Sequence, residues 1–242
     1  MQPERYYGQA FFTASSWSEV KRQINEYWDE DYYITDFDYG DGVYLVVMSQ
    51  VSGWGGQTLL YGRTLPDDEI SSKWDEGYYI TNMLYDGDWI VVMTQVENCI
   101  DQYYFTRSVP SVFNDMIGEG WDDGKSLTKL CCEPGIPSVY CAVMSEFSYP
   151  TPAQTRNIKP GRLTASQLGE LCEGDQYITE LFDLDGAIMV VTTERDDFYT
   201  TAIYQSSSLS RVAGAISDYW DDGYTLTTVA FYDGEWFLVF CK

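Results

Sequence analysis

Apolar and polar residues alternate along this chain with two periods, one typical of helices and one typical of strands. From Ser16 to Tyr27, the apolar residues Trp17, Val20 and Ile24 recur three or four positions apart, with charged residues between them. This spacing predicts a helix with one packed face and one wet face. Between residues 82 and 94, an alternating stretch, an Asp-Gly pair and a β-branched run follow one another. This order predicts a β-hairpin, because Asp-Gly suits both central positions of a type I′ turn.

Both patterns recur five times, so the chain is a tandem repeat. Each copy contains an eight-residue segment that ends with threonine and begins with Trp-Asp in four copies and with Cys172-Glu173 in the fourth. The segments begin roughly 46 to 51 residues apart, and they occupy residues 28–35, 74–81, 121–128, 172–179 and 220–227. The Asp-Gly pair recurs in four copies, at Asp41-Gly42, Asp86-Gly87, Asp185-Gly186 and Asp233-Gly234, and a longer loop through Glu133 to Pro137 replaces it in the third.

We expect a further strand before each helix, so that the repeat is strand, helix, strand, hairpin turn, strand. These first strands are predicted at residues 7–13, 58–64, 102–108, 154–158 and 200–206. The second helix should begin after Pro66, at Asp67, and the last should follow Ser210 as N-cap. The chain is then a single domain, residues 1–242, of five repeats at approximately 6–51, 57–96, 102–147, 153–194 and 199–242.

This pattern predicts an α+β repeat protein of five β-α-β-β units. One unit cannot bury both faces of its sheet, whereas stacked neighbours can. The short links between units suggest that each first strand continues the preceding hairpin as a three-stranded meander. We therefore predict a closed five-bladed α/β propeller, in which the N-terminal strand from Tyr6 to Phe12 completes the last blade and leaves no exposed edge. An open solenoid is the alternative.

The segment Trp74-Asp-Glu-Gly-Tyr-Tyr-Ile-Thr81, followed by Trp89-Ile-Val-Val-Met93, resembles the repeats in the C-terminal region of plant casein kinase 1-like protein kinases. Similar repeats of unknown function occur elsewhere, and the resemblance runs over all five units. It implies a non-catalytic accessory module, because the chain contains no Gly-rich loop, HRD or DFG motif. The five-fold layout also resembles the pentein α/β propellers, whose guanidine-modifying enzymes need a catalytic histidine that this sequence lacks.

Charge narrows the range of partners. The chain carries 38 acidic and 14 basic residues, a formal net charge of -24. Such a field repels phosphate backbones and anionic lipid headgroups, so we expect neither nucleic acid nor a membrane as partner. Basic proteins, cations and neutral ligands remain. We also find no signal peptide and no apolar run long enough to cross a bilayer.

The chain contains no histidine, which removes the usual general base and the usual zinc ligand. We therefore expect no enzyme, no catalytic residues, no metal site and no cofactor. The six cysteines form no CxxC pair, so we interpret them as thiols of a cytoplasmic, reducing compartment.

The Trp-Asp pairs are candidate binding residues with two interpretations. An aromatic face beside a carboxylate could bind a sugar, and a ring of such platforms would make a multivalent lectin. Alternatively, each tryptophan ends its helix and packs under the sheet, which the replacement by Cys172 favours. The pairs are Trp28-Asp29, Trp74-Asp75, Trp121-Asp122 and Trp220-Asp221.

Trp54 is a further candidate, because glycines flank it in a segment that we interpret as a flexible loop, from Val51 to Gly56. An exposed tryptophan there could anchor a partner. The repeated threonines could instead form hydrogen bonds between blades; they are residues 35, 81, 128, 179 and 227.

Asp36, Asp38 and Asp41 are spaced like the start of an EF-hand, but Val47 stands where the bidentate glutamate is required, so no calcium loop is predicted. Taken together, the sequence predicts a non-enzymatic scaffold whose acidic surface binds a basic or neutral partner protein. A lectin is one alternative. A carboxylate-based hydrolase, which needs two convergent acids, is the other.

Overall fold

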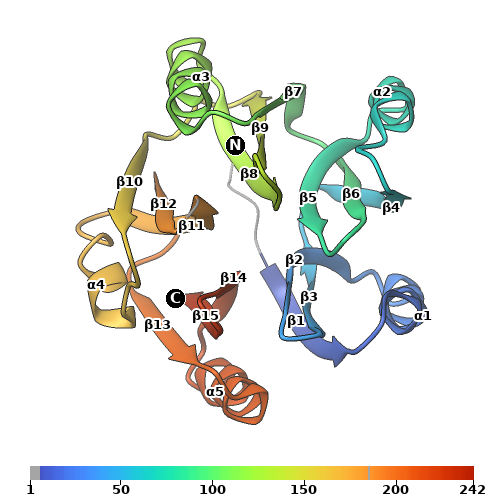
Figure 1. Cartoon of the computed structure of the whole chain (residues 1–242). Coiled ribbons are helices and arrows are strands. Elements are labelled where there is room, and N and C mark those ends of the chain that lie inside the picture. The colour runs from blue at the N-terminus through green and yellow to red at the C-terminus, as the bar shows by residue number, and fades with distance from the viewer. Residues whose placement is uncertain (1–5, 185) are drawn as a thin grey trace. The chain divides into compact units, whose positions relative to one another are not determined.

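Each of the five repeats folds into one three-stranded antiparallel sheet with one helix (Figure 1). This computed structural model describes residues 6–184 and 186–242. The described chain divides into two compact units. Unit 1, residues 52–152, holds repeats 2 and 3, and unit 2, residues 6–51 and 153–242, holds repeats 1, 4 and 5.

Unit 1 contains two repeats of the same order. Repeat 2 consists of β4 (Trp54–Gly62), α2 (Asp67–Asp75), β5 (Tyr79–Tyr85) and β6 (Trp89–Val96). Repeat 3 consists of β7 (Cys99–Arg107), α3 (Pro110–Asp122), β8 (Ser126–Glu133) and β9 (Val139–Phe147).

Unit 2 contains the other three repeats. Repeat 1 consists of β1 (Tyr6–Ala14), α1 (Trp17–Trp28), β2 (Tyr33–Gly40) and β3 (Val43–Val51). Repeat 4 consists of β10 (Gln154–Pro160), α4 (Ala165–Gly169), β11 (Gln176–Leu184) and β12 (Ala187–Glu194). Repeat 5 consists of β13 (Thr201–Ser206), α5 (Leu209–Asp221), β14 (Thr225–Tyr232) and β15 (Glu235–Cys241).

The first strand of each repeat belongs to the sheet of its own repeat, and the predicted meander is wrong. In repeat 1 the strand order is β1-β3-β2, and β3 is antiparallel to both neighbours. The N-terminal strand therefore does not complete the last sheet. The physical reason is the helix: β1 and β2 run parallel, and parallel strands need a crossover connection, which α1 supplies. The central strand β3 is buried along most of its length, as expected for a strand with a partner on both sides.

Local signals place the helices and turns. Ser16 caps α1 by accepting a hydrogen bond from the Glu19 amide, and α2 begins at Asp67 as predicted. The last helix begins at Leu209 with Ser208 as N-cap, two residues earlier than the sequence indicated. Asp41-Gly42 and Asp233-Gly234 both have positive φ at both residues, as a type I′ turn requires, whereas in the pair Asp86-Gly87 only the glycine has positive φ. Asp185 of the remaining pair lies outside the described residues.

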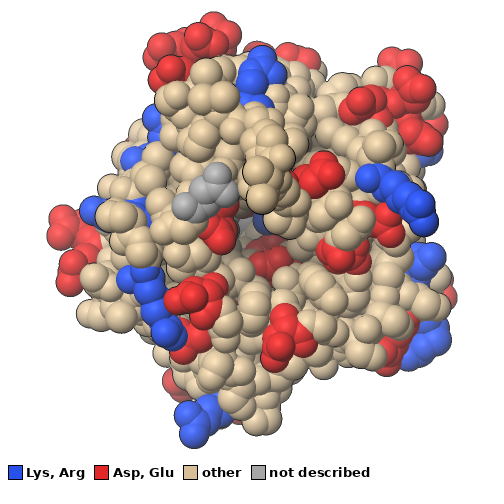
Figure 2. Space-filling model, in the orientation of Figure 1, with Lys and Arg blue, Asp and Glu red and all other residues tan. Residues whose placement is uncertain are grey.

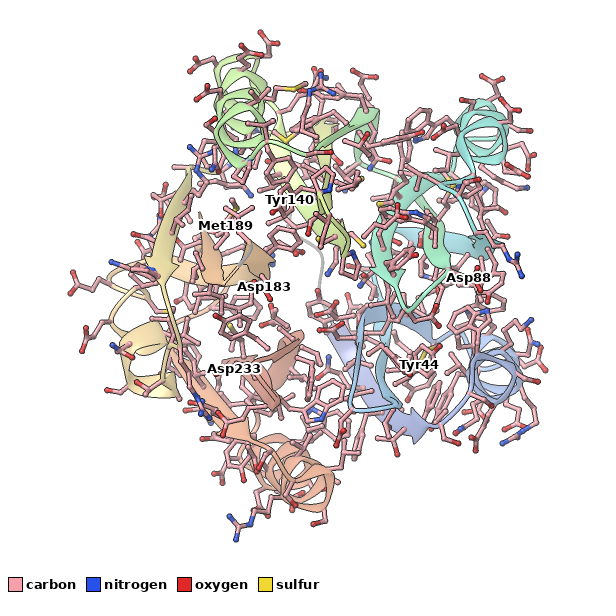
Figure 3. All side chains as sticks on the ribbon, in the orientation of Figure 1. Tyr44, Asp88, Tyr140, Asp183, Met189 and Asp233 are labelled. Carbon is pink, nitrogen blue, oxygen red and sulfur yellow. The ribbon has the colours of Figure 1, made fainter. Side chains whose placement is uncertain are left out.

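The core of each repeat lies between its helix and its sheet. Tyr44 and Tyr140, labelled in Figure 3, occupy the same position in repeats 1 and 3 and are at least 96% buried. Tyr44 packs against Trp17 of α1, and Tyr140 packs against Phe113 of α3, with ring centroids 5.8 and 5.5 Å apart. Large aromatic rings therefore fill the same gap in different repeats.

Neighbouring repeats within a unit share apolar clusters. In unit 1, Ile80 and Met93 of repeat 2 pack with Cys141 of repeat 3. In unit 2, β2 lies beside β14 so closely that a Cβ on Gly40 would fall 2.0 Å from the Phe231 ring. Among the described residues, no helix is long and apolar enough to cross a bilayer.

Candidate functional site

The Trp-Asp pairs lie at the ends of the helices. Each tryptophan is half-buried within the last two residues of its helix, and the aspartate beside it is exposed. The four pairs of this kind are Trp28-Asp29, Trp74-Asp75, Trp121-Asp122 and Trp220-Asp221. The exposed carboxylates can meet a partner, whereas at least two of the indole rings have partners inside the protein.

The Trp74 ring is held by the first strand of the next repeat. Its Nε1 donates a hydrogen bond to Gln102 Oε1 of β7, 3.1 Å away, and its ring lies 5.8 Å from that of Tyr104. Gln102 also binds the backbone of Ile80, accepting from its amide at 2.6 Å and donating to its carbonyl at 3.0 Å. The fourth bond runs from Gln102 Nε2 to Ser145 Oγ at 2.9 Å. The buried amide group of Gln102 therefore joins repeats 2 and 3 as a clamp.

An equivalent clamp joins repeat 5 to repeat 1 in unit 2. Trp220 Nε1 donates to Gln9 Oε1 of β1 at 3.0 Å, and Gln9 binds both the amide and the carbonyl of Leu226, at 2.8 and 2.9 Å. Gln9 also donates to Ser49 Oγ at 3.0 Å, and Phe11 packs edge-on against Trp220. The two clamps match bond for bond, which favours a structural role for these two tryptophans.

Repeat 4 carries Cys172 in place of the tryptophan, and repeat 5 carries Thr201 in place of the glutamine. The Cys172 thiol donates a hydrogen bond to the Leu168 carbonyl, and the Cys241 thiol lies 3.5 Å from Thr227 Oγ1. Both members of the clamp are therefore replaced together at this junction. Burial raises the pKa of the Cys172 thiol and raises the pKa of Cys241 to about 11. Both thiols are protonated at neutral pH and are poor nucleophiles.

The repeated threonines form hydrogen bonds within their own sheet, so the predicted bonds between blades are wrong. Each threonine is the extra residue of a β-bulge between the second and third strands. Thr81 Oγ1 lies 2.7 Å from Thr94 Oγ1, and Thr128 Oγ1 lies 2.8 Å from Ser145 Oγ. A bulge leaves backbone groups without hydrogen-bond partners on the neighbouring strand. The threonine hydroxyl stabilises the distorted second strand by a bond to the third strand.

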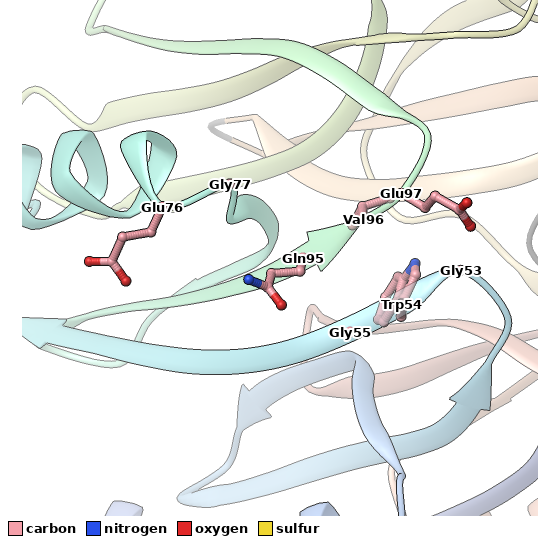
Figure 4. Close-up of a pocket in the computed structure, with 8 residues that line it drawn as sticks. All are labelled: Gly53, Trp54, Gly55, Glu76, Gly77, Gln95, Val96 and Glu97. Atoms are coloured by element: carbon pink, nitrogen blue, oxygen red, sulfur yellow. The ribbon is translucent and has the colours of Figure 1, made fainter.

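Trp54 stands at the start of strand β4, beside a pocket of about 410 Å³ (Figure 4). The predicted flexible loop around it is wrong from Trp54 onward, since the strand begins there. Gly55 and Gly56 form a bulge opposite Gln95 of β6, and Gln95 Oε1 accepts a hydrogen bond from the Gly56 amide at 3.3 Å. A Cβ at Gly56 would lie 2.9 Å from the Tyr78 hydroxyl. The pocket therefore depends on these glycines.

Carboxylates lie at both ends of this pocket. Glu97 follows β6 and lies with Trp54 at one end in Figure 4, while Glu76 follows α2 and lies at the other. Lys73 Nζ is 2.6 Å from Glu76 Oε2 and lies over the Tyr78 ring, so Glu76 already has a cation beside it. The exposed Glu97 is thus the carboxylate available to a cation at the Trp54 end.

Two of the other acids singled out by sequence, Asp36 and Asp38, have structural partners. Asp36 Oδ2 accepts a hydrogen bond from the Val229 amide at 2.7 Å, and Asp38 Oδ2 accepts one from the Phe231 amide at 2.6 Å. These bonds join β2 to β14 within unit 2. Within residues 6–184 and 186–242, no group of three or more metal-ligating side chains is arranged to hold a metal ion.

The sequence was compared with known proteins. Residues 3–130, slightly more than half of the chain, match the model of a domain of unknown function, DUF7477. The chain belongs to the DUF7477 family. The matched part of this DUF7477 chain covers repeats 1 and 2 and most of repeat 3, and so includes the Trp54 pocket. No curated protein matches the chain.

Sequence reasoning missed the glutamine clamps and the acids around Trp54 in this DUF7477 protein. The clamps had a signal: a glutamine stands at one register position of the first strand in four repeats, at Gln9, Gln57, Gln102 and Gln154, and Thr201 replaces it in the repeat that follows Cys172. Glu76 and Glu97 had no such signal in the sequence, because they belong to other segments of repeat 2 and come near Trp54 only when the chain is folded.

Proposed function

We propose that this protein is a non-enzymatic binding module that docks a basic protein through its acidic surface, with the Trp54 pocket as the principal contact. The observation that carries the proposal is the pocket itself, in which a tryptophan and two carboxylates line a hollow of about 410 Å³. Aromatic rings and carboxylates are the side chains that hold cationic groups. A hollow of this size lies within the range of pockets that bind ligands, about 300–1,000 Å³.

The distribution of charge supports a basic partner. Figure 2 shows groups of carboxylates over α2 and over α3, both in unit 1. A net charge of -24 attracts cationic partners over distances near the Debye length, and it repels nucleic acid and anionic membranes. The six free cysteines are consistent with work in a reducing, cytoplasmic compartment.

We further propose that the five repeats close into a five-bladed α/β propeller. The clamp from Gln9 to Trp220 and the bonds from Asp36 and Asp38 support closure, because they join the first repeat to the last in the same way that Gln102 joins two successive repeats. A closed, compact chain of this length should have a radius of gyration near 18 Å by small-angle scattering. A distinctly larger value would support the open solenoid instead.

A rigid frame without a catalytic set suits a scaffold, as does the resemblance to the accessory repeats of casein kinase 1-like kinases. The lectin alternative has less support, because the indole NH groups of Trp74 and Trp220 are bonded to glutamines. The hydrolase alternative has less support too, because the acids singled out at Asp36 and Asp38 bind backbone amides.

The proposal is tested with an array of peptides and glycans probed with the whole protein at 50 and 300 mM salt. We expect binding to peptides rich in lysine or arginine, weaker at the higher salt, and no binding to acidic peptides. Equal binding to acidic and basic peptides, or binding to glycans alone, would contradict it.

A further inference from the structure

One end of the sheet in repeat 3, the end at which β7 and β8 begin and β9 ends, holds a lysine between two carboxylates. We call it the outer end of the sheet. Lys125 Nζ lies 2.6 Å from Asp101 Oδ2 and 3.0 Å from Glu146 Oε2, and 5.8 Å from the centre of the Tyr103 ring. The Lys125 side chain is 11% exposed, so the cation fills this end of the sheet. The hydrogen bonds outweigh the opposing effect of burial and raise the pKa of Lys125.

The same end of the sheet in repeat 2 has its lysine elsewhere, because Lys73 comes from α2 and pairs with Glu76. By strand register, Gly56 stands where repeat 3 has Asp101, Tyr78 where it has Lys125, and Gln95 where it has Glu146. The three positions are neutral, and the Tyr78 side chain lies over Gly56, where a Cβ would fall 2.9 Å from its hydroxyl, so a neutral ring takes the place of Lys125. The acids of this region stand instead at the rim of the hollow, as Glu76 and Glu97. Repeat 2 therefore has a neutral ring where repeat 3 has Lys125, and an open pocket lies at this end between Trp54 and the two glutamates.

We propose that the Trp54 pocket takes a lysine or arginine side chain of the partner protein, which lies beside the Glu97 carboxylate as Lys125 of repeat 3 lies beside Asp101 and Glu146. This inference rests on the proposed function and names its contact. The cation pairs with Glu97, since Glu76 is already paired with Lys73, and its alkyl chain and charge lie against the Trp54 ring.

The backbone of the pocket supports this assignment. A Cβ on Gly55 would lie 3.1 Å from Gln95 Oε1, and one on Gly53 would lie 3.6 Å from Glu97 Oε2. A larger residue at Gly55, which lines the pocket, would fill part of the space that a partner side chain needs. The glycines thus hold open a hollow whose polar lining, two glutamates and a glutamine, is rich in acceptors for a cationic donor.

The test is a fluorescence anisotropy titration of the whole protein with a labelled peptide, Ser-Gly-Arg-Gly-Ser-Gly-Arg-Gly-Ser, at 50 mM salt. Two pocket variants, Trp54→Ala and Glu97→Gln, are compared with Glu69→Gln, which removes the same charge from the exposed first turn of α2 in the same unit. We expect each pocket variant to weaken binding roughly tenfold and Glu69→Gln less than roughly twofold. Circular dichroism melts check that all three variants fold.

The outcomes separate the two proposals. If the wild type binds the peptide but the pocket variants weaken binding no more than Glu69→Gln does, the pocket assignment fails while the docking of basic partners stands. If the wild type does not bind the peptide at any salt, both fail. Displacement of the peptide by a neutral oligosaccharide but not by free arginine amide would also overturn the assignment.

Discussion

Repeats 2 and 3 share a frame, which consists of the three-stranded sheet, its threonine-stabilised bulge and the glutamine clamp. They differ at the outer end of the sheet. In both, a bulged second strand is stabilised by a threonine, through Thr81 and Thr128, and Gln102 joins the two sheets. At the outer end, repeat 3 places Lys125 between two carboxylates, whereas repeat 2 has a glycine bulge and a pocket. The frame therefore tolerates very different side chains at this end.

This difference shows where function can vary at a small cost to the stability of the fold. The frame depends on buried groups, such as Ile80, which is 1% exposed. The outer end is exposed and carries charge, so substitutions there change what the protein presents to a partner. Mutations that break the frame should lower stability, and mutations at the outer end should change binding.

The largest effect is expected from Gln102→Ala, which breaks the frame that both repeats share. The change leaves the Ile80 amide and carbonyl and the Trp74 indole NH without their partner, and each buried unsatisfied group costs about 1–3 kcal/mol. We expect a loss of about 3 kcal/mol or more in the free energy of unfolding, measured by urea denaturation. The matched control is the exposed Gln95→Ala, which should stay within about 0.5 kcal/mol. Similar losses in both variants would contradict the clamp.

A smaller effect, about 1 kcal/mol, is expected from Lys125→Met in repeat 3. The hydrogen bond from Lys125 lowers the pKa of Asp101. The stability that Asp101 contributes is therefore present above its unfolded pKa and is lost as pH falls through the lowered pKa of the folded state. The pKa of Lys125 is raised, so its contribution is lost as pH rises through the raised folded value. The difference in stability between wild type and variant should therefore be largest between roughly pH 5 and pH 10. A difference that does not change with pH would show that packing alone is responsible.

The smallest effect is expected from Thr81→Val and Thr128→Val, compared side by side. Each removes one half-buried hydroxyl that bonds to the third strand of its repeat, so each should cost about 1 kcal/mol or less. The two losses should be equal, because the bulge is the same in both repeats. Thermal melts of the two variants measure this, and unequal losses would show that the frames differ.

Much of the frame could be predicted from sequence, because its signals are local. Ser16 and Asp67 mark helix starts, and Asp41-Gly42 marks a hairpin. The pairing of the first strand of each repeat could not be predicted from local signals. The short link at Ser52-Gly53 suggested a hairpin between β3 and β4, but β3 already pairs with β1 and β2 on its two edges. Pairing is decided by the crossover helix and by burial of the central strand on both faces.

The site was predictable in part. Trp54 stood out because glycines flank it, but the acids around it come from the end of α2 and the end of β6 and meet it through the fold. The clamp at Gln102 was present in the sequence as a repeated glutamine, although its partners lie in the preceding repeat. Patterns within one repeat were easier to interpret than contacts between repeats.

The most direct test of the central claim converts the outer end of repeat 2 into that of repeat 3. The triple variant Gly56→Asp, Tyr78→Lys, Gln95→Glu should place a lysine between two carboxylates at the edge of the pocket, where it competes with a partner's cation, and its net charge changes by one unit. If the pocket receives a cationic side chain, the arginine peptide should bind this variant at least roughly tenfold more weakly than the wild type while the melting temperature stays close to that of the wild type. Unchanged peptide binding by a folded triple variant would contradict the account.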